Sequence, residues 1–548
     1  MKRKIPLLAL TSAMLASCSI SINPKQSSSS PASASESAPT SSVAPSTDSQ
    51  ESKPLPEVSS EEPAPAVSES ASSEEDSGKG YAKFSTEDIR LGNYPSHNVF
   101  QDDSVLDSIG DQKLLVIPVY TTDGGTFTQA ELNMIETAYN GESDETGWRS
   151  LRTFYEESSY GKLSMRATLV SPYALGKTTS AFAKQYANWD ESDFGNYLNT
   201  IVQSYASAVD LKQFDQNNDG YIDGVEFVYK NNGTEWDGYS STTEVWWAFT
   251  NLTYKSANKT NPVAGAYFWS PYDMIETNYY TPNIDVHTLV HETGHLLGAD
   301  DYYSYGAETD GFPAGMVDMM DCNVGDHNAF TKSIYGWVDP YAPDGSKDQF
   351  EITLNSFQSS GDCLILVDPS KWNGTVYDEY FMLSYYTPDG LYEEDVSGYP
   401  EYSGSDMNNG KIYQKAGLQM FHVDARVGTY NQRSGKVTFA TDPLDEDACM
   451  LASNTSSYSK SGYTLIEAIS ADGVNHFKGS RASSRYFGSQ KVLFGTSAYG
   501  CGSSEFTANT AKNILKNSTK MNNGNAIPWN FSVTEQTDST ITLYVTKN

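Results

Sequence analysis

Positive charge is scarce in this chain of 548 residues, in which 36 Lys and Arg stand against 70 Asp and Glu. The formal net charge is −34 at pH 7. Because such a surface repels phosphate groups, nucleic acid is not expected as a partner. After the N-terminus, no run approaches the roughly 18 consecutive apolar residues that a membrane-spanning helix needs. We therefore expect contact with a membrane only through the N-terminal end.

Cysteine is also rare, with five residues in the whole chain. Four of them, Cys322, Cys363, Cys449 and Cys501, are widely spaced and fit no zinc-finger pattern. Two disulfides and four free thiols are both compatible with this spacing, and the sequence leaves the choice open.

The fifth cysteine, Cys18, ends a segment with a basic start, an apolar run and the residues L-A-S. This pattern resembles a bacterial lipoprotein signal, in which residues 1–17 are removed and lipid is attached to Cys18. An ordinary signal peptide with an incidental cysteine is the alternative. Residues 18–80 are rich in Ser, Pro and Glu with few large apolar side chains, so we expect a disordered tether. The protein is then expected at the outer face of the bacterial cell membrane, or secreted if it is shed.

The rest of the chain divides by its patterns into two parts. Residues 81–340 mix a buried strand at 113–120 with helices, the first opened by the capping pair Thr128 and Glu131. Two further helices are expected at 148–159 and 193–209. Residues 341–548 consist of short strands separated by turn residues, which favours a β-sandwich-like region. The expected fold class is therefore α+β.

An acidic loop, D-Q-N-N-D-G-Y-I-D-G-V-E, occupies residues 215–226. Its oxygen-bearing residues have the spacing of a calcium loop, with Gly220 at the sharp turn. A strand is expected at 225–230, so the site does not belong to a helix–loop–helix unit. An ion-free surface turn is the alternative. The predicted ligands are Asp215, Asn217, Asp219, the carbonyl of Tyr221, Asp223 and Glu226.

A helical stretch within residues 284–303 contains H-E-T-G-H. His291 and His295 lie one turn apart on the same face, where two imidazoles can bind one metal ion. Glu292 follows the first ligand and is placed to act as a general base towards water. Gly298 can end the helix in a left-handed conformation and bring Asp301 back towards the histidines as a third ligand.

Two other histidines are not interpreted as metal ligands, and His287 is expected either to support the site from outside the ligands or to be simply structural. His287 lies four residues before His291, but eight residues of helix span about 12 Å, so His287 and His295 cannot readily share one ion. His422 and Asp424 lie on the same side of a strand and could bind a metal, but a satisfied pair is the favoured interpretation.

The stretch H-E-T-G-H-L-L-G-A-D-D-Y-Y resembles the zinc signature of the immune inhibitor A family of secreted bacterial metallopeptidases, a metzincin-like group. F-Y-E-E-S-S-Y-G-K-L and F-T-K-S-I-Y-G-W also resemble that family, and the resemblance covers roughly residues 110–340. It implies a metzincin-like catalytic domain with zinc on the three ligands above, although Asp300 is a competing neighbour of Asp301. It also supports a structural calcium. A methionine is implied beneath the metal, where Met320 fits better than Met316 or Met319.

The resulting hypothesis is a zinc-dependent endopeptidase that cleaves extracellular proteins or peptides, acts as a monomer and is anchored by lipid. Glu292 would be its catalytic residue. No tyrosine follows Met320 at the metzincin spacing, so an oxyanion-assisting tyrosine is not assigned, with Tyr302 and Tyr303 as candidates. A catalytically silent surface-binding lipoprotein and a metal-stabilised structural lipoprotein are the alternatives.

Overall fold

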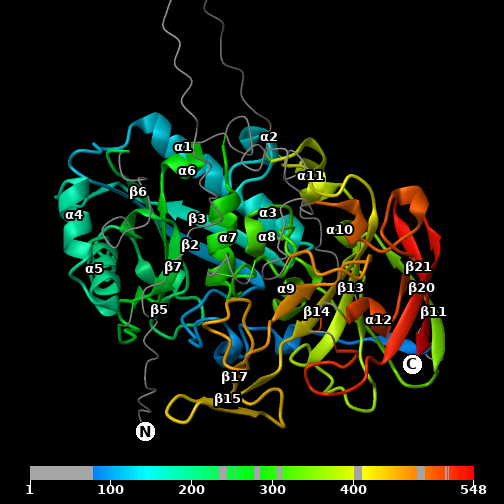
Figure 1. The fold of residues 1–548 in the computed structure, drawn as a ribbon. Coiled ribbons are helices and arrows are strands. Elements are labelled where there is room, and N and C mark those ends of the chain that lie inside the picture. Colours follow the sequence, from blue (N-terminus) through cyan, green and yellow to red (C-terminus); the bar gives the residue numbers. More distant parts are fainter. Residues whose placement is uncertain are drawn as a thin grey trace, which may run out of the picture. The chain divides into compact units, whose positions relative to one another are not determined.

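Helices and mixed β-sheets make up the computed structural model, which is compatible with the expected α+β class (Figure 1). It describes residues 78–233, 244–253, 255–276, 284–304, 311–399, 410–477, 488–512, 515 and 518–548. The expected signal sequence, Cys18 and nearly all of the 18–80 tether lie outside these residues. The described residues belong to one compact unit.

The first sheet is mixed, with parallel strands and one antiparallel edge. Its central strand matches the buried strand expected at 113–120, because the apolar run from Leu114 to Val119 is covered on both faces. The strands, in spatial order, are β3 (Leu163–Leu169), β2 (Gly110–Tyr120), β6 (Val225–Lys230), β9 (Ala266–Pro271) and the antiparallel β7 (Phe249–Leu252), with β4 (Tyr173–Ala174) also pairing β2.

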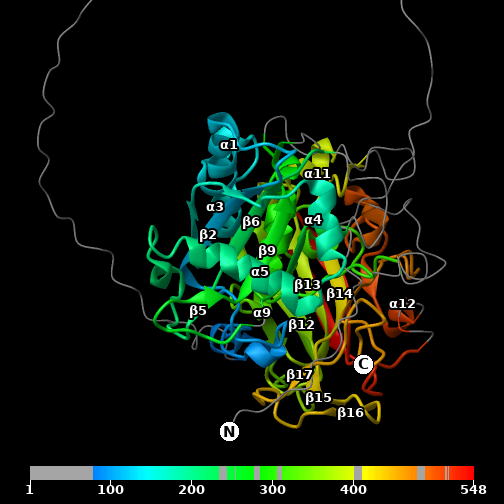
Figure 2. The same ribbon diagram turned by 90° about the vertical axis from the view of Figure 1, so that its left-hand side faces the viewer.

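Helices cover both faces of this sheet. Alternate residues of β2 point to opposite faces, so they pack against different sets of helices. Leu114 and Val116 join one core cluster, and Leu115 and Ile117 join another. The first cluster includes residues of α1 (Gln129–Asn140), α3 (Leu151–Ser158) and α7 (His287–Leu296), and the second includes residues of α4 (Thr179–Tyr186) and α5 (Glu191–Ser204) (Figures 1 and 2).

The expected helices are present, although the third, expected to end at 209, ends at Ser204. Thr128 and Glu131 form the predicted capping box of α1. The helix expected at 148–159 is α3, which begins directly after its cap Ser150. The helix expected at 193–209 is α5, which begins earlier because Asp190 caps it and accepts hydrogen bonds from backbone amides.

The β-rich part contains two larger sheets that face each other across an apolar core. Ile352, Phe381 and Leu543 are buried in this core and come from both sheets. One sheet has the order β1 (Tyr81–Lys83), β10 (Tyr341–Pro343), β12 (Cys363–Leu366), β13 (Glu379–Tyr386), β14 (Gly417–Asp424) and β18 (Ile466–Ala468). The other has the order β11 (Gln349–Asn355), β21 (Thr540–Lys547), β20 (Trp529–Gln536) and β19 (Glu505–Phe506).

Smaller elements complete the described chain. A three-stranded sheet has the order β16 (Lys436–Phe439), β15 (Val427–Asn431) and β17 (Cys449–Met450), and a two-stranded one pairs β5 (Tyr221–Ile222) with β8 (Val263–Ala264). The short helices are α2 (Ser143–Thr146), α6 (Asp273–Glu276), α8 (Met319–Cys322), α9 (Ala329–Ile334), α10 (Phe357–Ser360), α11 (Glu393–Ser397) and α12 (Ala508–Ala511). No helix among the described residues is long and apolar enough to cross a membrane.

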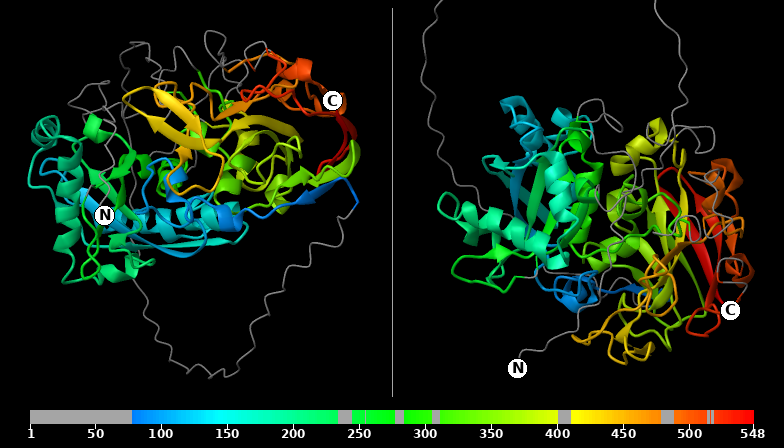
Figure 3. Two further views of the ribbon diagram at one scale, coloured as in Figure 1. Left: turned by 90° about the horizontal axis from the view of Figure 1, so that it is seen from below. Right: turned by 60° about the vertical axis from the view of Figure 1, so that its left-hand side comes forward.

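The two parts share one hydrophobic core and lie side by side (Figure 3). Leu289 of α7 belongs to the same buried cluster as Ile365 of β12 and Phe421 of β14. In addition, β1 pairs with β10, so residues 81–83 join a sheet of the β-rich part. The boundary expected at 340/341 thus marks the start of the second group of sheets, while the packing continues across it.

The four cysteines of the described chain are all buried. Cys363, Cys449 and Cys501 are free thiols. The sequence left disulfides and free thiols both open, and for these three cysteines the structure shows free thiols. Cys322 lies at the end of α8. Burial raises the pKa of the Cys363 thiol, so it stays protonated and unreactive as a nucleophile.

Candidate metal centre

Helix α7 carries the two predicted histidine ligands (Figure 1). It begins beside Asp285, whose carboxylate accepts a hydrogen bond from the amide of His287 at 3.0 Å. The helix ends as predicted before Gly298, which has a φ of +98°. A side chain there would also meet Asn98, because an added Cβ would lie 2.7 Å from the Asn98 Cβ. Only glycine meets both requirements.

Three predicted ligands converge where the chain turns back after this helix. One oxygen of the Asp301 carboxylate lies 3.1 Å from Nε2 of His291 and 3.3 Å from Nε2 of His295. Four ligands at about 2.0–2.1 Å in a tetrahedron lie about 3.3–3.4 Å apart. The spacing of these atoms therefore fits a zinc ion bound by two imidazoles and one carboxylate.

Hydrogen bonds on the far side of each ring favour the same conclusion. Nδ1 of His291 lies 2.7 Å from the carbonyl oxygen of Met319, and Nδ1 of His295 lies 2.9 Å from that of Ala299. A carbonyl only accepts, so Nδ1 of each ring donates and Nε2 is the nitrogen left with a lone pair in the neutral ring. Two such lone pairs beside a carboxylate make a cation-binding set.

Electrostatics at the centre are dominated by Asp301. Burial alone would raise the pKa of its carboxyl, but the adjoining imidazoles of His295 and His291 hold that pKa well below the ordinary range. Burial alone would lower the pKa of His295, and the Asp301 carboxylate raises it to about 10. Without a bound cation, Asp301 and His295 therefore form an ion pair, and a metal that bound here would displace the extra proton of His295.

The neighbouring Asp300 does not compete for this position. Its carboxylate accepts a hydrogen bond from the Asp301 amide at 3.0 Å and another from the side chain of Ser453. Burial and the charge of Asp301 raise its pKa to about 6. Among the described residues, the group that can hold a metal here consists of His291, His295 and Asp301, which agrees with the predicted set.

Glu292 lies beside the ligands and is almost fully buried. The hydroxyl of Thr250, on the antiparallel edge strand β7, lies 2.9 Å from its carboxylate and 3.0 Å from its backbone carbonyl, and is shared between the two. Burial raises the pKa of Glu292 above its ordinary value, while the nearby histidines oppose that rise. A buried carboxylate with a raised pKa is suited to proton transfer. No pattern in the sequence marks Thr250, because the contact joins a strand to a distant helix.

Met320 packs directly against α7, the helix that carries His291 and His295. A Cβ added at Gly294 of α7 would lie 2.5 Å from the Met320 sulfur, so the two fit only because Gly294 lacks a side chain. Met319 instead contributes its backbone carbonyl to His291. Met316 has a left-handed backbone with a φ of +61°. Of the three methionines, Met320 is the one whose sulfur lies against Gly294.

The two candidate tyrosines differ in their surroundings. The hydroxyl of Tyr302 lies 2.7 Å from that of Thr331 on α9, inside the core. The ring of Tyr303 instead lies 6.3 Å from the ring of His291, between centroids. Tyr303 is therefore the tyrosine of this pair that lies next to the centre.

His287 is held by acidic and aromatic neighbours and lies outside the metal-binding group, as expected. Its ring stacks on Trp148 with centroids 4.2 Å apart. Its nitrogens lie 3.0 Å from Asp285 and 3.4 Å from Glu394. Burial alone would lower the pKa of His287, but these carboxylates raise it to about 9. It forms a buried ion pair that ties α7 to the β-rich part.

The acidic loop brings together three of its predicted calcium ligands. One carboxylate oxygen from each of Asp215, Asp219 and Asp223 lies within 4.8 Å of the others. An oxygen of Asp215 and one of Asp223 are buried without a hydrogen-bond partner. Burial raises the pKa of Asp223 to about 7. A calcium ion would supply the missing partner for these oxygens, since it prefers carboxylate ligands.

The turn at Gly220 and a strand near the end of the loop are present as predicted. Gly220 has a φ of +101°, and the Asn217 side chain accepts a hydrogen bond from the Asp219 amide at 2.9 Å. The strand, β6, begins at Val225, one residue before the loop ends at Glu226. Asn217 and the carbonyl of Tyr221 stay predicted ligands.

Glu226 was predicted as the twelfth-position calcium ligand, and its contacts do not place it there. It is fully buried on β6 and lies 3.1 Å from the hydroxyl of Thr293 on α7. The Thr293 hydroxyl donates to Glu226 and, at 2.7 Å, to the carbonyl of Leu289. Burial raises the pKa of Glu226 to about 7, although the hydrogen bond from Thr293 opposes that rise. In the described chain, the metal-binding group of the loop does not include Glu226.

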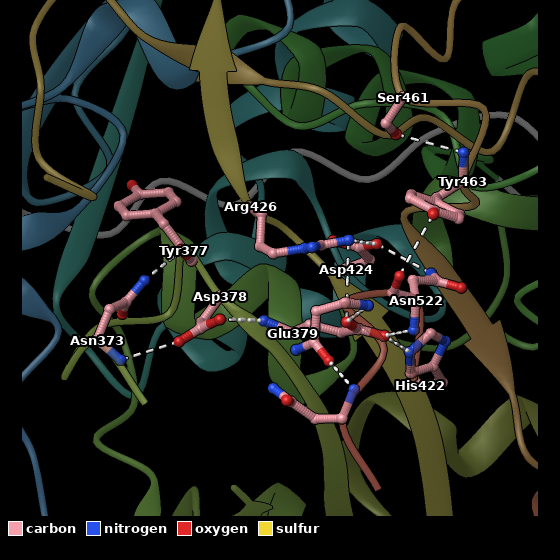
Figure 4. A network of polar contacts seen from close by, with 12 residues as sticks. Asn373, Tyr377, Asp378, Glu379, His422, Asp424, Arg426, Ser461, Tyr463 and Asn522 are labelled. Atoms are coloured by element: carbon pink, nitrogen blue, oxygen red, sulfur yellow. Dashed lines mark hydrogen bonds and ion pairs between the residues drawn. The ribbon is translucent and has the colours of Figure 1, made fainter. Parts of the chain in front are cut away.

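His422 and Asp424 form ion pairs and hydrogen bonds within the β-rich part (Figure 4). Nε2 of His422 lies 2.9 Å from Glu379, and Arg426 donates two hydrogen bonds of 2.7 Å to Asp424. Burial alone would lower the pKa of His422, but Glu379 and Glu467 raise it to about 9. Each residue is thus paired with a different neighbour, His422 with Glu379 and Asp424 with Arg426, which supports a structural role for both.

Comparison with models of known protein families and with curated protein sequences finds no match for this chain. Its function is therefore inferred from the residues of the site and their arrangement.

Proposed function

We propose that this protein is a zinc-dependent endopeptidase that hydrolyses peptide bonds in extracellular proteins. The observation that carries the proposal is the convergence of Nε2 of His291, Nε2 of His295 and one oxygen of Asp301, with a buried Glu292 beside them. Two imidazoles and one carboxylate leave one tetrahedral position for water or substrate, which distinguishes catalytic from structural zinc sites.

Each residue has a distinct part in this reaction. Zinc bound here would polarise the scissile carbonyl and make water more acidic. Glu292 accepts the proton of the attacking water and later gives it to the leaving amine. The hydroxyl of Thr250 orients Glu292 through its contact with the carboxylate. Among the described strands, β7 pairs only with β9, so its other side can align an extended peptide next to Glu292.

The proposed fold is a metzincin-like catalytic domain followed by a β-sandwich-like region. The mixed sheet, the helix α7 and the packing of Met320 against Gly294 support it. The resemblance of residues 284–303 to the immune inhibitor A family adds to this proposal. Calcium bound by Asp215, Asp219 and Asp223 would have a structural role.

The proposed location is the outer face of the bacterial cell membrane, with lipid on Cys18. It is supported by the L-A-S-C site that follows a basic start and an apolar run. The substrate is a protein or peptide, and the acidic composition disfavours nucleic acid as a partner. The protein is proposed to act as a monomer.

Digestion of casein by the full-length protein tests the activity. We expect cleavage that stops when a chelator removes zinc and returns when zinc is added back. A protein that contains zinc and calcium but leaves casein, gelatin and unfolded protein intact would contradict the proposal. That outcome would favour the alternative of a catalytically silent surface-binding lipoprotein.

A further inference from the structure

The segment that carries Asp301 is held by three consecutive residues from a distant part of the chain. Asn454 donates a hydrogen bond of 2.6 Å from its side-chain amide to the carbonyl of Tyr302. Thr455 donates one of 3.3 Å from its hydroxyl to the carbonyl of Tyr303. Ser453 pairs with the carboxylate of Asp300. Residues 453–455 thus contact the chain on both sides of Asp301.

These three residues are themselves fixed by the β-rich part. All three are buried, with exposed fractions of 6%, 3% and 3%. The side-chain oxygen of Asn454 accepts a hydrogen bond of 2.9 Å from the amide of Ile466, the first residue of β18. The hydroxyl of Ser453 accepts one of 3.2 Å from the amide of Thr455. The position of the Asp301 segment is therefore set by a sheet outside the first part of the chain.

A second anchor acts on the same segment. The amide of Tyr302 donates a hydrogen bond of 2.8 Å to the carbonyl of Met320. The neighbouring carbonyl, that of Met319, accepts from His291. Tyr302 is thus held through its amide by the segment that supports His291, and through its carbonyl by Asn454. Asp301 immediately precedes this doubly held residue.

The segment needs such anchors because α7 has already ended. Gly298 adopts a left-handed conformation, and beyond it Asp301 is outside the helix that holds both histidines. The contact of Ser453 with Asp300 also occupies the neighbouring carboxylate, which leaves Asp301 as the ligand.

We propose that Asn454 is a positioning residue for the third zinc ligand, assisted by Ser453 and Thr455. The β-rich part then completes the metal centre and is more than an attached binding module. This inference rests on the proposed zinc site, because it concerns how Asp301 is presented to the metal.

Substitution of Asn454 in the full-length protein tests the inference. Asn454→Ala removes the donor to Tyr302. Loss of such outer partners of metal ligands typically lowers metal affinity by about 10–100-fold, and we expect a change in that range. Thr455→Val removes one hydroxyl with little change in shape, so a smaller loss in the same direction is expected. If Asn454→Ala does not fold, the zinc affinity of Thr455→Val tests the inference instead.

Asn373→Ala is a matched control. Asn373 also lies in the β-rich part and donates from its side-chain amide to a tyrosine carbonyl, that of Tyr377, at 2.8 Å (Figure 4). Its hydrogen bonds join Thr375, Tyr377 and Asp378, none of which belongs to the segment around Asp301. The zinc affinity of this variant should equal that of the unmodified protein.

Three measurements separate positioning from general stability. Zinc affinity is measured by competition with a chelator, ligand geometry by the visible absorption of the cobalt-substituted protein, and stability by the melting temperature of the metal-free protein. Asn454→Ala should weaken zinc binding and alter the cobalt spectrum beyond anything seen in Asn373→Ala. If the unmodified protein binds zinc and the variants at 454 and 455 match it in affinity and spectrum, the inference is wrong while the proposed function stands. If the unmodified protein binds no zinc, both fail.

Discussion

Replacing Glu292 by Gln separates catalysis from metal binding. The carboxylate of Glu292 contacts the hydroxyl of Thr250, and the amide oxygen of Gln can accept the same hydrogen bond. The two side chains have nearly the same shape, so α7 and its packing should be preserved. The three ligand atoms come from His291, His295 and Asp301, and the substitution changes none of them.

The expected loss follows from the role of the carboxylate. An amide cannot accept a proton from water, so the whole contribution of general acid–base transfer is removed. That contribution is typically about 10²–10⁴-fold, which corresponds to about 3–5 kcal/mol of transition-state stabilisation. Thr250→Val is a graded comparison, because it leaves the carboxylate and removes only its orienting partner. We expect a loss of about 10-fold in that variant.

The assay combines the cleavage rate of a fluorescent protein substrate with zinc content by elemental analysis and with melting temperature. Glu292→Gln should retain zinc and stability while losing activity. Near-full activity in Glu292→Gln would refute the assignment of the general base. Loss of zinc together with activity would instead show that Glu292 supports the metal site directly.

Asp301→Ala should lose both zinc and activity, whereas Asp300→Asn should keep its zinc; equal zinc content in the two would contradict the ligand assignment. Calcium removal should lower the melting temperature before zinc content changes, and Asp219→Ala should reproduce this decrease. If the melting temperature of both proteins is independent of calcium, the loop is an ion-free turn. Glu226 has a folded pKa of about 7 against an ordinary 4.5, so the stability it contributes is complete below pH 4.5 and is lost as pH rises through 7. Glu226→Gln should therefore raise the free energy of unfolding above pH 7, by at most about 3 kcal/mol. Urea unfolding at about pH 6 and pH 8.5 measures this difference. An equal effect of the substitution at both pH values would argue against a protonated carboxyl in the folded protein. Cys18→Ala should leave the protein unprocessed or release it from membranes, measured by fractionation, and unchanged retention and size would exclude lipidation.

Much of the metal centre could be predicted from residues that are close in the chain. The spacing of His291 and His295 places them on one helical face whatever surrounds the helix, because about 3.6 residues make one turn. The reversal at Gly298 and the return of Asp301 are equally local, since they depend on one left-handed residue. The same holds for Gly220 and the three aspartates of the acidic loop. Local geometry acts over about a dozen residues, and the sequence determined these features by itself.

Other features depended on which distant segments meet. Spacing placed Glu226 at the last position of the calcium loop, yet its strand turns the carboxyl towards Thr293 of α7. Nothing near Thr250 in the chain marks it as the partner of Glu292. The anchoring of Tyr302 by Asn454 joins residues 152 positions apart. Such contacts arise when sheets and helices pack together to bury apolar surface, and the choice of neighbours belongs to that packing. The tertiary structure alone therefore decided which side chain contacts Glu292 and which residues hold the segment around Asp301.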